Sequence, residues 1–346
     1  MVFTNKINNQ VLGETSEMYQ FETIIGESAA LRETIKVAKR VGMLNFNILL
    51  NGESGTGKEL FAQAIHGRSR PNGPFVAVNC ASIPKSLIES ELFGYEGGAF
   101  TGAEKGGRTG KIESADQGTL FLDEIGDMPL EIQPALLRVI EDKKVFRLSS
   151  NRYIPVNFRL IAATNKDLRK MVQAKTFRED LYYRLSTFCI KIPSLKDRGR
   201  DEIILLARYF VEKASQQLPC LPPKIHAEVY EVLTEYSWPG NVRQLENTMT
   251  YAVLMTQNGL MKKENLPDDL KTDFSCLESE IRNVENNFTG IANYPFGRED
   301  FLSLKEMEEN AIKKVMLHTQ NDKQRVAEIL GLSKSTLYRK LKEYNL

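Results

Sequence analysis

The segment NGESGTGKEL, residues 51–60, has the residue types of a phosphate-binding loop. Three glycines allow the backbone to approach an anion closely: Gly52, Gly55 and Gly57. The amino group of Lys58 can then reach the β- and γ-phosphates of a nucleotide. The pattern usually continues with Ser or Thr, whose hydroxyl helps to hold Mg²⁺, but this chain has Glu59. The spacing therefore predicts nucleotide binding with one metal contact missing.

Two carboxylates end the segment GTLFLDE, residues 118–124. In phosphate-loop ATPases an acid at a strand end holds Mg²⁺ directly or through water, and the next acid can deprotonate the attacking water. We assign Asp123 to the metal and Glu124 to water activation. Two acids after a strand are by themselves usually a loop or a helix cap, but their pairing with the glycine loop favours catalysis. With Asp123 and water in the metal shell, the missing hydroxyl weakens one Mg²⁺ contact without removing the phosphate cradle.

The elements that must position these groups alternate between short apolar runs and helical patterns. Five runs indicate strands: 46–50, 75–79, 119–122, 158–163 and 188–192. Helical patterns between them cover 60–65 and 132–140, so we predict an α/β fold with a parallel sheet flanked by helices. The first strand leads into the glycine loop and Lys58 opens a helix, which lets backbone N–H groups and the positive helix end converge on one anion. A glycine-rich turn beside a helix is the alternative.

Strand signals stop after Pro193, and the following residues indicate a small helical subdomain. A polar stretch with Asn, Gly and Pro then predicts a linker. These signals divide the chain into five parts: an N-terminal arm, 1–20; an α/β subdomain, 21–192; a helical subdomain, 193–270; a linker, 271–300; and a terminal helical domain, 301–346.

The terminal domain has the pattern of a helix-turn-helix unit. Ser303 and Glu306 have capping-box spacing, a second helix over 322–330 stops at Gly331, and a third starts at Ser333. Six basic residues face one acidic residue between 323 and 342, which is the electrostatic footprint of DNA binding.

The third of these helices is the candidate DNA-reading element. Its N-terminal part would enter the major groove with Lys334, Ser335, Thr336, Tyr338 and Arg339. Lys340 and Lys342 would contact phosphate, which adds salt-dependent affinity without sequence information. The alternative is a packing hairpin with an ordinary solvated face.

Composition excludes several other classes. The chain has 346 residues, 42% of them hydrophobic and 26% charged, and a formal charge of +1, so any DNA binding must come from a local patch. Cysteines at 80, 189, 220 and 276 form no C-x-x-C pair, and the three histidines are far apart, which predicts ordinary thiols and no zinc site. No run approaches the roughly 18 apolar residues of a membrane span. We therefore predict a cytoplasmic protein that does not bind membranes.

Seven longer motifs occur in a specific order: GESGTGKE at 52–59, FVAVNC at 75–80, ESELFGYEGGAFTGAEKG at 89–106, GTLFLDEIGD at 118–127, AATN at 162–165, FREDLYYRL at 177–185 and WPGNVRQLEN at 238–247. With these motifs the sequence resembles the bacterial enhancer-binding activators of sigma-54 RNA polymerase, a branch of the AAA+ ATPases. The resemblance covers about residues 21–270, in which 21–192 would be the ATPase subdomain and 193–270 its helical lid. The helix-turn-helix at the end of the chain is similar to that of the factor for inversion stimulation. GESGTGKE is this family's own form of the phosphate loop, so Glu59 is no anomaly, although its effect on Mg²⁺ stays open.

The resemblance implies further roles. Thr164 and Asn165 would sense the γ-phosphate, and Asn79 would restrain Glu124 until nucleotide is bound. Arg243 would be the second sensor. The implied nucleotide contacts are Gly52, Glu53, Ser54, Gly55, Thr56, Gly57, Lys58, Glu59, Gly118, Asp123, Glu124 and Arg243. The implied cofactors are ATP and Mg²⁺.

Two arginines of the family pattern would act between subunits. Arg178 and Arg184 resemble fingers that reach a neighbouring subunit's nucleotide, so hydrolysis would need a ring, which in this family is expected to be a hexamer. The local sequence alone equally allows both arginines to pair with Glu179 and Asp180 on a solvated face.

The GAFTGA segment resembles the loop that grips sigma-54, with contacts from Gly98, Ala99, Phe100, Thr101, Gly102 and Ala103. Surrounding glycines predict flexibility, and Tyr95 and Phe100 are aromatic groups that a soluble loop has no obvious reason to expose. Composition alone favours a disordered surface loop. The family commonly has a basic residue where this chain has Gly97, which removes a positive charge from the loop base.

Together these features imply an ATP-driven activator in the bacterial cytoplasm, at the nucleoid. It would bind double-stranded enhancer DNA and remodel the closed complex of sigma-54 polymerase. The chain begins almost at the ATPase domain, so control would come from a partner protein or from a missing regulatory region. The alternatives are a DNA-binding regulator of the ordinary polymerase, or an AAA+ remodeller or helicase loader without a promoter role.

Overall fold

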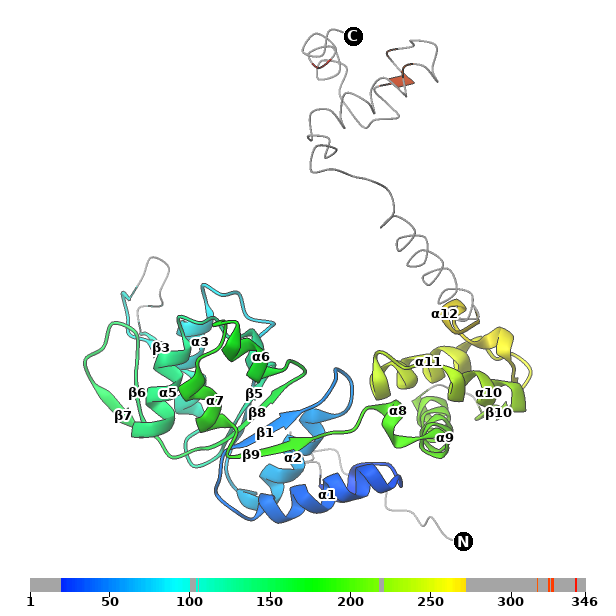
Figure 1. The fold of residues 1–346 in the computed structure, drawn as a ribbon, viewed down its shortest axis with the longest axis horizontal. Coiled ribbons are helices and arrows are strands. Elements are labelled where there is room, and N and C mark those ends of the chain that lie inside the picture. Colours follow the sequence, from blue (N-terminus) through cyan, green and yellow to red (C-terminus); the bar gives the residue numbers. More distant parts are fainter. Residues whose placement is uncertain are drawn as a thin grey trace, which may run out of the picture. The chain divides into compact units, whose positions relative to one another are not determined.

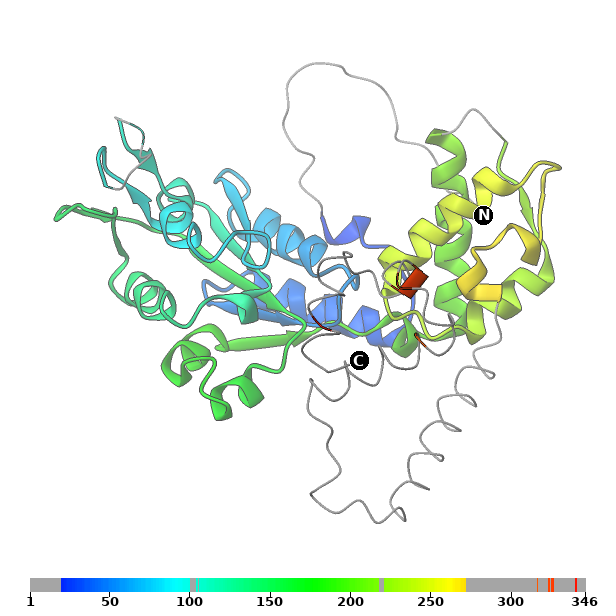
Figure 2. The ribbon, with the colours of Figure 1, turned by 90° about the horizontal axis from the view of Figure 1, so that it is seen from above.

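The computed structural model describes residues 20–99, 104, 106–217, 221–271 and five further positions near the C-terminus (Figures 1 and 2). The chain divides into two compact units, Met1–Thr272 and Asp273–Leu346. In the second unit the described positions, all helical, are Met316, Lys323, Arg325, Val326 and Lys340. Val326 is buried there. Among the described residues, no helix combines the length and apolar character needed to cross a membrane.

A five-stranded parallel sheet forms the centre of the first unit. Its order is β2-β5-β8-β1-β9, with bounds Phe75–Asn79, Thr119–Asp123, Arg159–Thr164, Ile48–Asn51 and Phe188–Lys191. The five predicted strands and the α/β class are confirmed, with strand ends shifted by at most two residues. Because all strands are parallel, their carboxyl ends share one edge of the sheet and their amino ends share the other.

The sheet is covered on both faces because its strand residues alternate between two cores. In β8, Leu160 and Ala162 belong to one buried cluster, whereas Ile161 and Ala163 belong to the other. Helices α1, Ala29–Gly42, and α2, Lys58–Ser69, pack with the second cluster (Figure 1). The first cluster contains α3, Ile88–Phe93, α4, Lys111–Ser114, α5, Gln133–Asp142, α6, Leu168–Gln173, and α7, Glu179–Leu185. Two short 3₁₀ helices, η1 over Phe21–Thr23 and η2 over Ile125–Asp127, complete this part.

Two short antiparallel pairs lie outside the central sheet. Strand β3, Gly94–Tyr95, pairs with β4, Arg108–Thr109, and β6, Lys144–Phe146, pairs with β7, Tyr153–Pro155. A Cβ at Gly94 would lie 2.5 Å from the carbonyl oxygen of Arg108, so this glycine serves close packing rather than flexibility. The expectation that Tyr95 is exposed is wrong: its exposed fraction is 7%, because the segment at Leu148 pairs with it.

The helical lid of the first unit has its own core. The lid contains α8, Leu195–Arg198, α9, Arg200–Gln217, α10, Ala227–Glu235, α11, Asn241–Met255, η3, Lys263–Asn265, and α12, Asp268–Lys271. Trp238 lies in this core, and its indole N–H donates to the Leu233 carbonyl at 2.7 Å. The prediction that strands cease after Pro193 is wrong in one detail, since β10, Lys224–Ile225, pairs with β11, Leu260–Met261. Two-residue strands are too short to show an alternating pattern.

Candidate active site

The glycine loop connects β1 to α2, as the sequence predicts. Gly55 and Gly57 have φ values of +76° and +97°, a backbone region that favours glycine. A Cβ at Gly55 would lie 2.3 Å from the carbonyl oxygen of Gly240 in the lid. Gly55 is therefore required both by the turn and by the close approach of the lid.

Lys58 is held at the centre of this loop. Its amino group donates to the Gly52 carbonyl at 3.0 Å and the Glu53 carbonyl at 3.2 Å, and it lies 3.4 Å from Glu124 Oε1. Its exposed fraction is only 7%. A buried cation at the N-terminus of a helix, surrounded by a glycine loop, suits the β- and γ-phosphates of a nucleotide.

Asp123 and Glu124 stand at the carboxyl end of β5, beside the loop. Burial and the neighbouring carboxylate of Glu124 raise the pKa of Asp123. A group whose ionised form is disfavoured in this way is suited to a cation that restores its charge balance, so Asp123 fits the Mg²⁺ role. Among the described residues, no cluster of three or more His, Cys, Asp or Glu could hold a metal alone. Mg²⁺ usually takes one or two carboxylates and completes its shell with water and phosphate oxygens.

Glu124 links the cation of the loop to the end of β8. While Oε1 faces Lys58, Oε2 accepts a hydrogen bond from the backbone N–H of Asn165 at 3.2 Å. Its backbone has a φ of +47°, unusual for a residue other than glycine, and such conformations cluster at functional sites. Thr164 is buried at the same strand end, where its Oγ1 accepts from the Lys166 N–H at 3.0 Å.

The structure does not join Asn79 to Glu124 through a described contact. Asn79 ends β2 in register with Asp123. Its side-chain oxygen accepts hydrogen bonds from the backbone N–H groups of Ala81 at 2.9 Å and Ser82 at 3.2 Å. The switch role assigned to it stays a prediction.

Glu59 and Cys80 border the carboxylates. Glu59 is exposed in the first turn of α2, where its Oε1 accepts from the Gln63 side chain at 3.3 Å. After burial and the charge of Glu124, the charge of Glu59 also contributes to the raised pKa of Asp123. Burial and the carboxylates of Asp123, Asp127 and Glu124 raise the pKa of the Cys80 thiol to about 12, which makes it an unreactive packing group.

The lid holds the glycine loop through several contacts that the sequence reasoning missed. Asn241 is fully buried; its Nδ2 donates to Glu53 Oε2 at 2.9 Å and to the Ser54 carbonyl at 3.0 Å. Its Oδ1 accepts from the Leu195 N–H at 2.7 Å. Arg198 adds a bond of 2.8 Å to the Thr56 carbonyl. Asn241 lies in the WPGNVRQLEN motif, but only the tertiary structure shows what its amide contacts.

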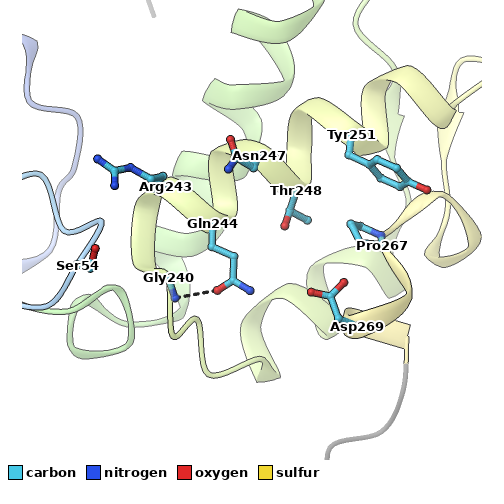
Figure 3. A pocket seen from close by; sticks show the side chains of 9 residues that line it. All are labelled: Ser54, Gly240, Arg243, Gln244, Asn247, Thr248, Tyr251, Pro267 and Asp269. Carbon is cyan, nitrogen blue, oxygen red and sulfur yellow. Dashed lines mark hydrogen bonds between the residues drawn. The ribbon is translucent and has the colours of Figure 1, made fainter. Parts of the chain in front are cut away.

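Arg243 stands at the junction of lid and loop. Its backbone N–H donates to the Gly55 carbonyl at 3.3 Å, and its side chain lines a cavity of about 540 Å³. Figure 3 shows Arg243 and Ser54 at one end of this cavity and Tyr251 and Asp269 at the other. The position beside the loop suits the second-sensor role.

The two candidate fingers differ in their surroundings. Arg178 forms a bidentate ion pair with Asp180, at 3.0 and 2.6 Å, which is the solvated pairing that the sequence left open. Arg184 is exposed near the amino ends of the strands, where Asn47, just before β1, donates to its carbonyl at 2.9 Å. Its side chain has no partner among the described residues.

Phe100, Thr101, Gly102 and Ala103 lie outside the described residues. The same is true of Lys334, Ser335, Thr336, Tyr338, Arg339 and Lys342. Gly98 and Ala99 are described, and Ala99 closes a turn with the Glu96 carbonyl at 3.1 Å.

Comparison with known proteins agrees with this geometry. Three family models match the chain: "Sigma-54 interaction domain" over residues 24–191, "AAA+ ATPase lid domain" over 196–280 and "Bacterial regulatory protein, Fis family" over 303–344. The DNA-binding transcriptional regulator NtrC of Escherichia coli is 41% identical over 98% of this chain and 72% of its own length. The chain belongs to the NtrC-type, sigma-54-dependent transcriptional regulators. The predicted family, α/β AAA+ fold and ATPase class are thereby confirmed.

Two further relatives support the NtrC-type assignment. A signal-transduction and transcriptional-control protein of Clostridium beijerinckii is 44% identical over 98% of this chain, which spans 51% of that relative's length. The crystal structure of NtrX from Brucella abortus in complex with ATP has a TM-score of 0.66 and 32% identity, covering 94% of this chain and 69% of that one. The likeness to these two relatives therefore extends over nearly the whole chain.

Proposed function

We propose that this NtrC-type protein uses ATP hydrolysis to convert the closed complex of sigma-54 RNA polymerase into an open complex while bound to enhancer DNA. The observation that carries the proposal is the arrangement of Lys58, Asp123 and Glu124 at one sheet edge, with the lid bonded onto the same loop. This arrangement supports the proposal, because ATP hydrolysis needs a phosphate-binding cation, a metal ligand and a base around one position.

In this account each residue has one task in hydrolysis. Lys58 and the loop N–H groups bind the phosphates, and Asp123 holds Mg²⁺, which supplies charge neutralisation when bound. Glu124 orients the attacking water and takes its proton. The bond from the Asn165 N–H fixes the Glu124 carboxylate, and Arg243 connects the phosphate position to the lid.

The positions of two groups at opposite edges of the sheet support the proposal that hydrolysis needs a ring. Arg184 lies beside Asn47, whereas Gly52 begins the phosphate loop at the other end of β1. Five residues of extended chain separate these positions by roughly 16 Å, and Arg184 lines a groove at the amino-terminal edge. Arg184 therefore serves a neighbour's nucleotide, which favours a homo-oligomeric ring, in this account a hexamer, with Arg178 as a second finger.

The remaining partners follow from the other segments. Residues Gly98–Ala103 would contact sigma-54, and the β3–β4 pair anchors the base of that loop. The terminal domain would bind enhancer DNA through Lys334, Ser335, Thr336, Tyr338, Arg339, Lys340 and Lys342, of which Lys340 is helical. Because polymerase and DNA are its partners, the protein would act at the nucleoid in the bacterial cytoplasm. A regulatory protein is a further partner.

Open-complex formation with purified sigma-54 polymerase, ATP and an enhancer template tests this proposal. We expect Phe100→Ala to abolish open complexes while ATP hydrolysis continues. Tyr153→Ala is the matched control, because Tyr153 is an exposed aromatic residue of the neighbouring β6–β7 hairpin, and it should retain activation. Activation of a polymerase that lacks sigma-54, or full activation by Phe100→Ala, would contradict the proposal.

A further inference from the structure

A groove of about 320 Å³ opens at the amino ends of β1 and β8, on the edge opposite the phosphate loop. We call it the basic groove. Three of its lining side chains are cations, Lys143, Arg159 and Arg184, and none of its described lining residues is acidic. Like charges gathered without a counter-ion repel one another, so such a groove is suited to a multiply charged anion.

Arg159 is the buried member of this group, with an exposed fraction of 2%. Its two terminal nitrogens donate to the Gly42 carbonyl at 2.7 Å and the Val41 carbonyl at 3.2 Å, at the end of α1. Its Nε has no hydrogen-bond partner among the described residues. Burial and the charge of Arg70 lower the pKa of Arg159 to about 10, because both disfavour its protonated guanidinium. A bound anion would relieve that cost.

Lys143 is the member that ordinary packing explains least. It follows α5 with a φ of +53°, where the left-handed backbone favours Gly or Asn. Its side chain is half-buried, with Nζ 3.4 Å from the Phe158 carbonyl oxygen and 4.6 Å from the Phe158 ring centroid. Burial, with the charges of Arg184 and Arg70, lowers the pKa of Lys143. Neither the backbone nor a carboxylate partner among the described residues accounts for a lysine here.

We propose that the basic groove is a phosphate-binding site in which Lys143 acts beside Arg184. Lys143 would donate to a phosphate oxygen from its half-buried position, and Arg159 would hold the wall of the groove and supply charge. If the phosphate belongs to a neighbouring subunit's nucleotide, the proposal rests on the proposed function, because that function includes the ring. A free polyphosphate offers the same chemistry, so two experiments separate the sources.

The first experiment measures binding of inorganic tripolyphosphate by calorimetry to a Lys58→Ala protein, which lacks the cation of the phosphate loop. For a free polyphosphate we expect one binding event that Lys143→Gln weakens by about tenfold or more and Lys143→Arg retains, since hydrogen bonds to charged groups have that strength. Lys144→Gln is the control, because Lys144 lies over the Tyr153 ring instead, at 4.7 Å from its centroid. Lys143→Gly removes the cation while easing the backbone, which separates charge from folding.

The second experiment measures ATP hydrolysis in mixed rings. Subunits with Lys143→Gln keep their own phosphate loop, and subunits with Lys58→Ala keep the basic groove. We expect Lys143→Gln alone to lower the rate by about tenfold to a hundredfold and Lys143→Arg to restore most of it. Mixing with Lys58→Ala subunits should raise the rate above that of either protein alone.

The outcomes are decisive together. Recovery in mixed rings identifies the neighbour's nucleotide as the phosphate source. Binding of tripolyphosphate that depends on Lys143, without recovery, identifies a free polyphosphate. If Lys143→Gln changes neither binding nor hydrolysis, or lowers only the melting temperature, the proposal is overturned. Wild-type hydrolysis that does not depend on assembly would instead contradict the ring in the proposed function.

Discussion

The two edges of the central sheet differ in the charges that they carry. At the carboxyl edge, Lys58 and Glu124 form an ion pair, and burial beside Glu124 raises the pKa of Asp123. At the amino edge, Lys143, Arg159 and Arg184 line one groove without an acidic neighbour among the described lining residues. A site that must bind a metal–nucleotide complex needs both signs of charge, whereas a site that only meets phosphate needs one. The contrast favours a reaction divided between two subunits.

The largest expected effect comes from the amino edge. Arg184→Gln should lower ATP hydrolysis by about 10³-fold to 10⁵-fold, because an arginine finger stabilises charge in the transition state. Arg138→Gln is the control, since Arg138 is an exposed arginine of α5 that pairs with Asp142. Steady-state hydrolysis measures the effect. A loss of less than about tenfold would contradict the assignment of Arg184 as an arginine finger at the amino edge.

The carboxyl edge should respond in a different way. Glu124→Gln should bind ATP with nearly normal affinity but hydrolyse it about 10²-fold to 10⁴-fold more slowly, because only proton transfer is lost. Glu141→Gln, at an exposed position of α5, should behave as wild type. Nucleotide titration and single-turnover hydrolysis separate the two steps. Normal turnover in Glu124→Gln would show that the base lies elsewhere.

A smaller effect is expected where the lid meets the carboxyl edge. Asn241→Ala removes the buried amide that bonds Glu53, Ser54 and Leu195, so we expect ATP affinity to fall about tenfold and stability to fall by about 1–3 kcal/mol. Asn247→Ala, six residues along α11 and exposed, is the comparison. Equal nucleotide affinities for the two variants would separate the lid contact from nucleotide binding.

The smallest effect concerns pH. His66 is fully buried beside the amino edge, with Nδ1 2.8 Å from Thr119 Oγ1. Burial and the charges of Arg159 and Arg70 lower its pKa, so the unfolded chain takes up this proton first as pH falls below about 6.5. The free energy of unfolding should therefore decrease with falling pH until the folded pKa is passed. His66→Gln should flatten this slope in urea titrations between about pH 7.5 and 5.5. An unchanged slope would mean that the amino edge tolerates a further positive charge.

The sequence was most informative where local pattern determines structure. The apolar runs predicted all five strands of the central sheet, because buried parallel strands need nearly continuous hydrophobic residues. The spacing of Gly52 to Lys58, and the acids after 119–122, predicted the residues that the structure brings together. The short pairs β3–β4, β6–β7 and β10–β11 escaped because two or three residues show no period.

What the sequence missed depends on long-range contacts. Tyr95 is buried because a segment more than fifty residues away pairs with it. Asn241 contacts the phosphate loop from another subdomain. In the sequence, nothing distinguishes Lys143 from the charged residues beside it.

Complementation between two inactive subunits tests the central claim most directly. The Lys58→Ala protein is mixed with the Arg184→Ala protein, and ATP hydrolysis is measured for the mixture and for each protein alone. We expect each protein alone to be inactive, and an equal mixture to regain about one quarter of the wild-type rate, because half of the subunits bind nucleotide and half of their neighbours supply arginine. A mixture as inactive as its components would show that the two edges do not act on one nucleotide.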